Sequence, residues 1–377
     1  MAIAAILHPS SIITTSFNKT RFPSLPQKNF FFKFSVKASS TSLEYSPSSS
    51  SSATAPKLST STSTWQWKFK ENAINVYFEE LKNEGKGGEV QKAKEILMIP
   101  TISDVSTVEE WREVAKDIVG RDGSVNYKAT IVDWPGLGFS DRPKLDYNAD
   151  VMEKFFVDLL NSSDSPLSSS AGNDLAVFGG GHAATIAVRA VNKGLVKPSA
   201  IAAIAPTWAG PLPIVFGRDS TMESRYGFLR GTLRAPAVGW MMYNVLVSNE
   251  KSIQSQYKSH VYANPENVTP SIIESRYELT KRSGARYVPA AFLTGLLDPV
   301  KSRDEFVDLF AKLEGEIPVL VVSTKGAPKR SKAEMDALRG AKGVSKFVEL
   351  PGALLPQEEY PIVVAEELYR FLQENFS

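Results

Sequence analysis

Apolar and polar positions follow one another along the chain in two different rhythms. From about residue 65 onward, short runs rich in β-branched apolar residues alternate with longer stretches in which apolar residues recur every three or four positions. The first rhythm is typical of buried strands, and the second is typical of helices with one apolar face. Because the two alternate, the sequence predicts an α/β fold with a mainly parallel sheet covered by helices.

The expected elements of the first half can be placed by residue number. The predicted strands span residues 65–70, 72–81, 95–101, 128–134, 174–178 and 200–205, and the predicted helices span residues 107–119, 148–160 and 183–191. The first two strands are expected to form an antiparallel pair. In the helix that starts at Thr107, this threonine is the expected N-cap of an apolar stripe that includes Trp111 and Ile118.

The alternation breaks between about residues 208 and 300. This stretch is interrupted by proline and glycine and has a helical pattern, with aromatic and methionine residues such as Trp240 and Met241. Afterwards the alternation resumes, with helices expected at 303–313, 332–339 and 362–374 and strands at 317–323 and 346–350. The sequence therefore predicts an eight-stranded, mostly parallel sheet with a helical cap inserted after the sixth strand.

Residues 1–38 differ in composition from the rest of the chain. They carry five basic residues and no acidic one, are rich in Ser, Thr and Phe, and end in Val-Lys-Ala, which resembles a stromal processing site. We expect a transit peptide to the chloroplast, with the stroma as destination; a merely disordered tail is the alternative. Residues 39–64 are mostly Ser and Thr and are expected to be a disordered linker. The folded domain is then expected to span residues 65–377.

Charge and residue content limit the chemistry that the chain can perform. The 377 residues include 43 basic and 41 acidic ones, and without the first 38 residues acidic side chains outnumber basic ones by three. Nothing in this balance indicates a nucleic-acid partner. The chain has no cysteine and three histidines, His8, His182 and His260, so we expect neither a metal nor a cofactor. No apolar run is long enough to cross a bilayer.

Residues 133–143 read Asp-Trp-Pro-Gly-Leu-Gly-Phe-Ser-Asp-Arg-Pro. This string resembles the strand-end signature D-x-P-G-x-G-x-S-x-x-P of α/β-hydrolases with an epoxide hydrolase or haloalkane dehalogenase type of core. Its glycines permit a tight turn off the strand. In that superfamily the motif shapes the core and one edge of the pocket without performing chemistry. The resemblance therefore implies a structural role for Asp133 and Trp134 at the edge of a pocket.

A second string, residues 177–184, reads Val-Phe-Gly-Gly-Gly-His-Ala-Ala and lies between a predicted strand and a predicted helix. In the superfamily this place holds the nucleophile elbow G-x-S-x-G, whose small flanking residues allow the turn that exposes the serine. By this resemblance Gly180 precedes the serine position, Gly181 occupies it and His182 follows it. Glycine cannot attack a carbonyl, but it removes the backbone strain that the elbow imposes on other residues.

The remaining catalytic positions of the superfamily also differ in this chain. The acid expected after the seventh strand aligns with Ala327, and the histidine expected after the last strand aligns with Leu354. In the oxyanion segment Pro100 has no N–H, whereas Thr101 and Ile102 could still donate one. The resemblance covers nearly all of the predicted domain, and it implies an α/β-hydrolase fold with a degenerate catalytic triad.

Shorter strings resemble cyanobacterial and plastid α/β-hydrolase-like proteins with a similarly altered elbow. They are Ala-Pro-Thr-Trp at 205–208, His-Val-Tyr-Ala-Asn-Pro at 260–265 and Leu-Asp-Pro-Val at 297–300. Asp298 in the last string could face the cleft or begin a turn with the following proline. The residues expected to line the pocket are Pro100, Thr101, Ile102, Asp133, Trp134, Gly180, His182 and Trp208.

Three functions stay open. The preferred one is a catalytically inactive α/β-hydrolase-like protein that binds a small molecule or a plastid protein, as a binding or scaffold protein of the chloroplast. The second is an enzyme of the superfamily that acts on an ester, epoxide or related molecule through non-standard residues such as His182, Asp133 or Thr101. The third is an ordinary hydrolase with a misaligned triad, although no histidine follows His260. A hydroxyl within hydrogen-bond reach of His182 or His260 would favour an enzyme over a hydrogen-bonded core histidine.

Overall fold

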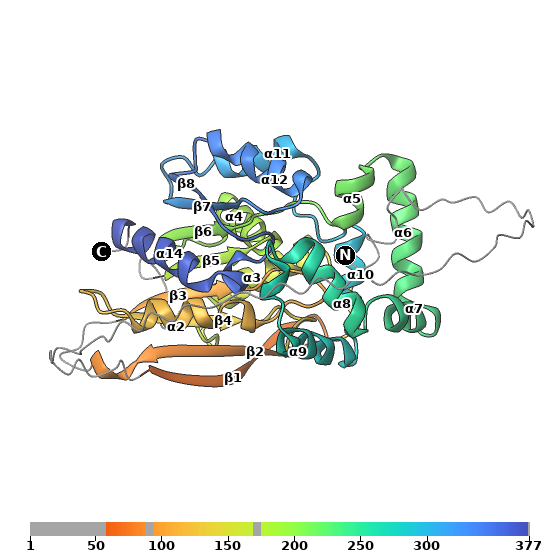
Figure 1. Cartoon of the computed structure of the whole chain (residues 1–377), viewed down its shortest axis with the longest axis horizontal. Coiled ribbons are helices and arrows are strands. Elements are labelled where there is room, and N and C mark those ends of the chain that lie inside the picture. Colours follow the sequence, from red (N-terminus) through yellow and green to blue (C-terminus); the bar gives the residue numbers. More distant parts are fainter. Residues whose placement is uncertain (1–57, 87–92, 169–174, 376–377) are drawn as a thin grey trace, which may run out of the picture. The chain divides into compact units, whose positions relative to one another are not determined.

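The computed structural model describes residues 58–86, 93–168 and 175–375. Its centre is a sheet of eight strands in the order β1-β2-β4-β3-β5-β6-β7-β8 (Figure 1). The strands are β1 (Leu58–Phe69), β2 (Asn72–Asn83), β3 (Lys94–Ile99), β4 (Tyr127–Val132), β5 (Leu175–Gly180), β6 (Ala200–Ile204), β7 (Val319–Thr324) and β8 (Lys346–Leu350). β2 is antiparallel to both of its neighbours, and the other pairs are parallel. The predicted eight-stranded, mostly parallel sheet is confirmed.

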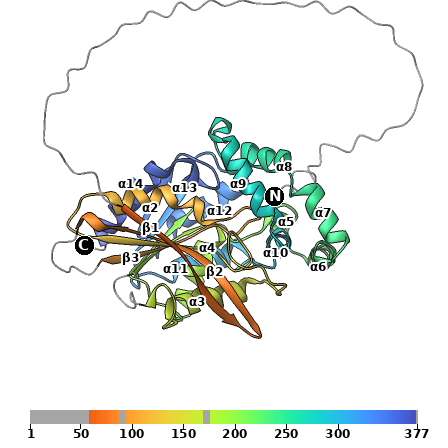
Figure 2. The ribbon, with the colours of Figure 1, turned by 90° about the horizontal axis from the view of Figure 1, so that it is seen from below.

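Helices cover both faces of this sheet (Figure 2). One face packs against α2 (Arg112–Gly120) and α14 (Pro361–Asn375), and the other packs against α3 (Ala149–Asn161), α4 (His182–Asn192) and α11 (Arg303–Ala311). Side chains of one strand alternate between the two cores, as Met98 and Leu97 of β3 do, because successive residues of a strand point to opposite faces. Strands buried on both sides explain the unbroken apolar runs in the sequence.

Between β6 and β7 the chain leaves the sheet and forms a helical cap (Figure 1). The cap consists of α5 (Pro211–Phe216), α6 (Ser220–Arg234), α7 (Val238–Leu246), α8 (Glu250–Gln256), the π-helical turn η5 (Tyr257–Val261), the 3-10 turn η6 (Pro265–Asn267), α9 (Pro270–Lys281) and α10 (Tyr287–Leu293). These helices fall within the stretch in which the strand–helix alternation was predicted to break. No helix in the described part of the chain is long and apolar enough to cross a membrane.

One buried arginine fastens the cap to the sheet domain. Arg276 of α9 is 1% exposed and forms ion pairs with Glu109, in the 3-10 turn η3 (Val108–Glu110), and with Glu358, in the short helix α13 (Pro356–Glu359). Its Nε donates to the Tyr257 hydroxyl at 3.0 Å. Each partner comes from a different element, so this side chain holds the cap and two segments beside the sheet in one arrangement.

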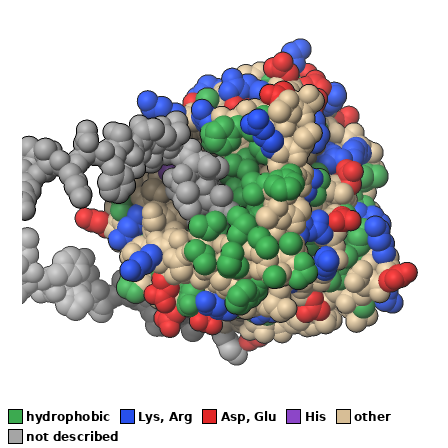
Figure 3. All heavy atoms as spheres, turned by 90° about the vertical axis from the view of Figure 1, so that its right-hand side faces the viewer, with side chains coloured by type: hydrophobic (Ala, Val, Ile, Leu, Met, Phe, Trp, Pro, Cys, Tyr) green, Lys and Arg blue, Asp and Glu red, His purple; other side chains and the backbone are tan. Residues whose placement is uncertain are grey.

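The cap also presents apolar side chains to solvent. Figure 3 shows hydrophobic side chains gathered on the face of the molecule on the right-hand side of Figure 1. Among the large hydrophobic side chains of the cap helices α6 and α7, Phe228 is 80% exposed, Val245 66%, Trp240 60% and Met241 56%. An exposed apolar face of this kind is typical of an interaction site.

One expectation from the sequence is corrected at the start of the sheet. The expected linker does not extend to residue 64, because the Ser/Thr-rich residues 58–64 already belong to β1. Sheet pairing uses backbone N–H and C=O groups, so a polar edge strand can pair along residues 77–83 of β2 without burying its side chains. The rest of the expected linker, and the expected transit peptide, lie outside the described residues.

Thr107 is the N-cap residue of the turn η3, as the sequence predicted, but its hydroxyl makes no capping hydrogen bond. The N–H of Val108, the first residue of that turn, donates at 2.8 Å to the carboxyl of Asp133, 25 residues further along the chain. A pattern search along the sequence finds only local caps, so it could not find this contact.

Candidate functional site

The turn between β5 and α4 has the backbone conformation of the predicted elbow. Gly181 has φ 53° and ψ −126°, a combination that strains every residue except glycine. Its N–H donates to the carbonyl of Ile204 at 3.0 Å, which fixes the turn against the end of β6. A Cβ atom at Gly179 would lie 2.8 Å from the backbone nitrogen of Ala184, so a glycine lets strand and helix meet here. The backbone turn of the elbow is present, but its central residue, Gly181, has no side chain.

A small cavity lies over Gly181. Apolar side chains from the loop after β3, the cap and the loop after β8 form much of its lining, including Ile102, Val261, Phe292 and Leu354. About 50 Å³ is open to the centres of water-sized molecules, which is room for a few waters. The lining also includes the polar residues Thr101, Ser103, His182, Thr207 and Gln256. An apolar cavity with a few converging polar groups is the usual form of a small-molecule site.

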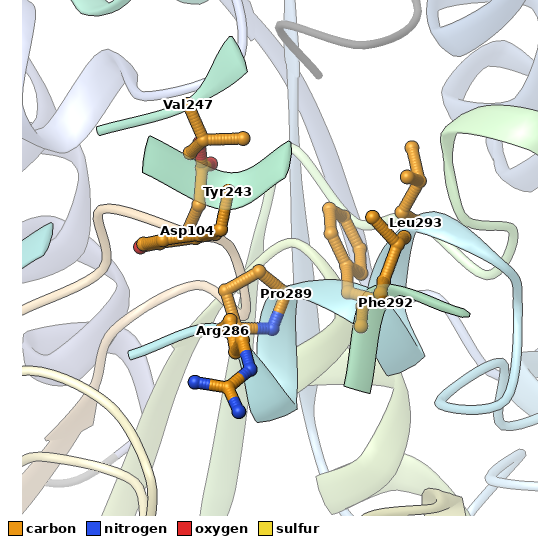
Figure 4. Close-up of a pocket in the computed structure, with 9 residues that line it drawn as sticks. Asp104, Tyr243, Val247, Arg286, Pro289, Phe292 and Leu293 are labelled. Carbon is orange, nitrogen blue, oxygen red and sulfur yellow. The ribbon is translucent and has the colours of Figure 1, made fainter. Parts of the chain in front are cut away.

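Phe292 of α10 also lines a second cavity (Figure 4). The second cavity is smaller, about 20 Å³, and is also lined by Asp104, Tyr243 and Arg286. Gln256, which lines the first cavity, donates to Asp104 of the second at 3.3 Å. The two cavities therefore share Phe292, and one hydrogen bond connects their linings.

A buried polar cluster surrounds His182 at the start of α4. Nδ1 of His182 lies 2.7 Å from the hydroxyl oxygen of Thr207, and Nε2 lies 3.4 Å from Oδ1 of Asp298. Thr207 belongs to the segment after β6, and Asp298 follows α10. The imidazole is 1% exposed and stands edge-on to the Phe292 ring, with 5.0 Å between ring centroids. The threonine hydroxyl thus satisfies the criterion set from the sequence for an enzyme.

Asp298 has other polar partners besides the imidazole of His182. Its carboxylate accepts the Gly210 N–H at 2.9 Å and forms an ion pair with Arg218. Asp298 is buried in this cluster and is not among the residues that line either cavity. Thr207 is the residue that sequence reasoning missed. It follows a strand at its carboxyl end, where sites of α/β sheets usually form, and this position was an available signal.

The N–H of Thr101 is not available to an oxyanion. It donates to Oε2 of Glu110 at 2.9 Å, while the Thr101 hydroxyl donates to Oε1 of the same carboxyl at 2.9 Å. Gln357 donates to this carboxyl as well, at 3.1 Å. Burial raises the pKa of Glu110 to about 7, and the nearby charge of Glu358 adds to the rise. The expected donation by Thr101 is corrected, because a buried carboxyl takes that N–H.

Pro100, Asp133 and Trp134 have structural roles beside the site. The indole N–H of Trp134 donates to the Pro100 carbonyl at 2.8 Å. The Asp133 carboxyl accepts the N–H groups of Val108 and Phe139, at 2.8 and 2.7 Å, and burial raises its pKa to about 8. None of the three is among the residues that line the cavity. The strand-end motif therefore braces the loops that surround the pocket.

The remaining candidates are split between the cavity and its supports. Leu354 lines the cavity, and its N–H donates to Val261 of the cap at 3.0 Å. Gly180 lies beneath Thr101, whose methyl group would be 2.7 Å from a Cβ at that position. The indole of Trp208 donates to Glu334 of α12 (Lys329–Ala337) at 2.9 Å. Ala327 lies in the loop between β7 and α12, outside the cavity lining.

Comparison with known proteins identifies the fold. No protein-family model matches the chain, and no curated protein matches it in sequence. Among solved structures, it is similar to haloalkane dehalogenase DatA from Agrobacterium tumefaciens C58, with a TM-score of 0.57, 14% identity, 83% of this chain covered and 97% of the other. It is also similar to a bromoperoxidase from Bacillus anthracis, with a TM-score of 0.56, 14% identity and coverage of 82% and 100%.

A third similar structure is a serine hydrolase involved in carbazole degradation, CarC, with a TM-score of 0.51, 15% identity and coverage of 80% and 95%. The matches span most of this chain and nearly all of the other chains. The chain has the α/β-hydrolase fold, as its motifs indicated. At these identities the likeness concerns the fold, and function has to be argued from the site.

Proposed function

We propose that this protein binds a small, largely apolar molecule in the cavity over Gly181, and that it has lost the serine-based hydrolysis typical of its fold. One observation carries the proposal. Gly181 keeps the strained backbone of a nucleophile elbow, while the side chain is absent and an apolar cavity lies directly above it. A fold that keeps the turn and the pocket but lacks the attacking hydroxyl can still bind a ligand there.

The residues around the elbow support this proposal. Leu354, at the position of the usual histidine, contributes an apolar surface to the cavity, and Ala327 lies outside the cavity lining. No lysine, arginine, aspartate or glutamate is among the described residues that line the cavity. A charged ligand would therefore lose its hydration without gaining an ionic partner, which favours an uncharged one.

The proposal is tested by filling the cavity. Leu354→Trp places a large side chain in the cavity, and Leu195→Trp is the matched control, because Leu195 is 43% exposed and outside the cavity lining. Native mass spectrometry of the chain purified from chloroplast stroma should show a bound small molecule in the wild type and the control, and its loss in Leu354→Trp. A wild-type protein that carries no small molecule contradicts the proposal.

The loss of serine chemistry has its own test. A fluorophosphonate probe modifies activated serines, and we expect every serine of the purified protein to stay unmodified because Gly181 offers no hydroxyl. Peptide mass spectrometry after labelling reads the result at each residue. Stoichiometric modification of a serine would show that the triad lies elsewhere.

The proposed location is the chloroplast stroma, on the basis of the composition of residues 1–38. Fused to a fluorescent protein, these residues should direct it into chloroplasts, and the fusion should be shortened on import. The control is the same fusion with the five basic residues changed to Gln, which removes the cationic character of a transit peptide. Retention of the unaltered fusion in the cytosol contradicts this location.

A second candidate function is the binding of a plastid protein through the cap. It is favoured by the exposed apolar side chains of α6 and α7, among them Phe228 and Trp240. The double variant Phe228→Ser/Trp240→Ser should abolish a stromal complex seen for the wild type by sedimentation and leave the melting temperature unchanged. A wild-type chain that sediments as a monomer in stromal extract removes this candidate.

A further inference from the structure

Three side chains from separate elements of the described chain meet beside the elbow in the order hydroxyl, imidazole and carboxylate. Thr207 and Asp298 stand on opposite ring nitrogens of His182, at 2.7 and 3.4 Å. We propose that Thr207 is a nucleophile, His182 its base and Asp298 a positioning residue, in a site that hydrolyses small uncharged esters with a short acyl group. This inference rests on the proposed function, because it assigns a reaction to the same cavity.

The hydrogen bonds define which nitrogen carries the proton. A carboxylate accepts and does not donate, so Asp298 favours the tautomer with the proton on Nε2. Nδ1 then has a free lone pair directed at the Thr207 hydroxyl, and a base in this position can take the hydroxyl proton. Gly210 and Arg218 hold the carboxylate from its other sides. The longer contact, 3.4 Å, is of the kind that shortens when substrate binds and the ring becomes charged.

The Thr207 hydroxyl borders the space that a side chain at the elbow would use. A Cβ atom built on Gly181 would lie 3.4 Å from Oγ1 of Thr207. The threonine oxygen is therefore close to where a serine at position 181 would present its oxygen, beside the first turn of α4. N–H groups in the first turn of a helix have no partner within the helix, and the positive end of the helix dipole favours a developing oxyanion.

The backbone before Thr207 is strained, and this fixes its direction. Ala205 has φ 43°, one of two positive values among the described non-glycine residues, and lines the same cavity. Its N–H remains bonded to Val322 of β7 at 2.8 Å. The hydroxyl of Thr185 in α4 donates to the Thr207 carbonyl at 2.8 Å. Strain of this kind is characteristic of sites in which a side chain has to be held in one position.

The proposed reaction balances with water as the only co-reactant. Oγ1 of Thr207 bonds to the ester carbonyl carbon while its proton moves to Nδ1 of His182. The bond from that carbon to the alcohol oxygen then breaks, and the leaving oxygen takes the proton from His182. Water attacks the acyl-threonine and gives a proton to His182, which returns it to Oγ1 as the bond to the acyl carbon breaks. One ester and one water become one acid and one alcohol.

The cavity defines the substrate class. About 50 Å³ of accessible space above Gly181 accommodates a short acyl group. Its lining includes the apolar side chains of Ile102, Val105 and Phe292, and the described lining contains no lysine, arginine, aspartate or glutamate. A carboxylate or phosphate on the acyl group would lack a partner there, so the acyl part is uncharged.

The test compares an ester with the matching amide on the purified mature chain. Phenyl acetate is the substrate. Acetanilide is the matching amide, which we expect the site to bind without hydrolysing it, and it serves as the ligand in a thermal-shift measurement. We expect the wild type to hydrolyse phenyl acetate, Thr207→Val to lower kcat/KM at least about 100-fold, and Thr207→Ser to remain active. Thr221→Val, an exposed hydroxyl on the cap, should behave as wild type. Peptide mass spectrometry of acid-quenched turnover should place the acetyl group on Thr207.

Asp298→Asn tests the positioning role. Asp298→Asn should lower kcat and leave KM unchanged. If the cluster were only structural, the variant would lose stability without this selective fall in kcat. Circular dichroism confirms folding of each variant, and Thr207→Ser keeps the hydrogen bond to His182 if Thr207→Val fails to fold. Equal hydrolysis by the wild type and a folded Thr207→Val or an acetyl group on another residue overturns the inference, and so does loss of activity in a folded Thr207→Ser.

The outcomes separate this inference from the proposed function. If acetanilide raises the melting temperature of the wild type but not of Leu354→Trp and no phenyl acetate is hydrolysed, the cavity binds and the reaction is excluded. If acetanilide has no effect and no ester is hydrolysed, both proposals fail. Hydrolysis that depends on Thr207 and is abolished by Leu354→Trp supports both.

Discussion

Gly181 shows at the scale of one residue how the chain differs from a serine hydrolase. Its φ of 53° and ψ of −126° match the elbow that the sequence predicted, and the nearest side-chain atoms, from Thr101 and Thr207, would be 3.4 Å from an added Cβ. The space would tolerate a small side chain. The cost of any other residue here is therefore mainly backbone strain rather than a clash.

We expect Gly181→Ala to lower the free energy of unfolding by about 1–3 kcal/mol, because alanine has to adopt the strained elbow conformation. Gly231→Ala is the control: Gly231 lies in α6 with nothing within 4 Å of an added Cβ, so it should gain about 0.5–1 kcal/mol. Urea unfolding measures both. A neutral Gly181→Ala would mean that the turn relaxes without its glycine.

Glu110 makes stability depend on pH. Its pKa is about 7 in the folded protein, mainly through burial, and about 4.3 in an unfolded chain. The folded state therefore keeps a proton that the unfolded state has released, and this contribution is full below the unfolded pKa and is lost as pH rises through 7. We expect the free energy of unfolding to fall between about pH 4.5 and 7, and Glu110→Gln to flatten that slope.

Urea midpoints at pH 5, 6, 7 and 8 measure this slope for the wild type and Glu110→Gln. Glu113→Gln is the control, because its side chain is 60% exposed and it should leave the slope unchanged. Buried Asp133, with a pKa of about 8, contributes a slope of the same sign in both proteins. A Glu110→Gln slope equal to that of the wild type would show that Glu110 stays ionised in the fold.

At the scale of elements, the cap is attached to the sheet domain through charge as well as apolar packing. Arg276 pairs with Glu109 and Glu358, and both acids belong to segments outside the cap. We expect Arg276→Met to cost about 3–5 kcal/mol, because it leaves two partly or fully buried carboxylates without their partner. Arg225→Met, an exposed residue of the same cap, should change stability by less than about 0.5 kcal/mol.

Urea unfolding measures the loss of stability in Arg276→Met, and limited proteolysis shows whether the cap becomes detached. If this residue fastens the cap, proteases should cut the variant first between α8 and α9, before the sheet domain is degraded. A variant that loses less than about 1 kcal/mol and is cut as slowly as the wild type would show that apolar packing alone holds the cap.

At the scale of the whole molecule, residues 58–64 extend the edge of the sheet as part of β1. Residues 58–64 pair with residues 77–83 of β2, the strand next to it in the sheet. A chain that begins at residue 65 should melt at a lower temperature than one that begins at residue 58, and it should associate, because half of β2 would expose unpaired backbone groups. Differential scanning fluorimetry and gel filtration measure both effects. Equal melting temperatures would show that residues 58–64 add nothing to the sheet.

The sequence by itself determined the alternation of strands and helices, the place of the cap and the identity of the elbow. These features are local: hydrophobic period separates strands from helices, and a run of small residues between a strand and a helix predicts a tight turn. The same reasoning identified His182 as a possible base, because it is the residue next to the altered elbow.

Only the tertiary structure decided what His182 contacts. Thr207 lies 25 residues from it in the chain, and Asp298 lies 116 residues away. The segment between His182 and Asp298 includes the entire cap. Contacts over such separations depend on how the cap packs against the ends of the strands, and they leave no periodic signal in the sequence. The same holds for Glu110, which takes the Thr101 N–H, and for Asp133, which accepts the Val108 N–H at the start of η3. In each case a buried polar group found a partner from a distant segment, because burial makes an unpaired polar group costly wherever the chain brings it.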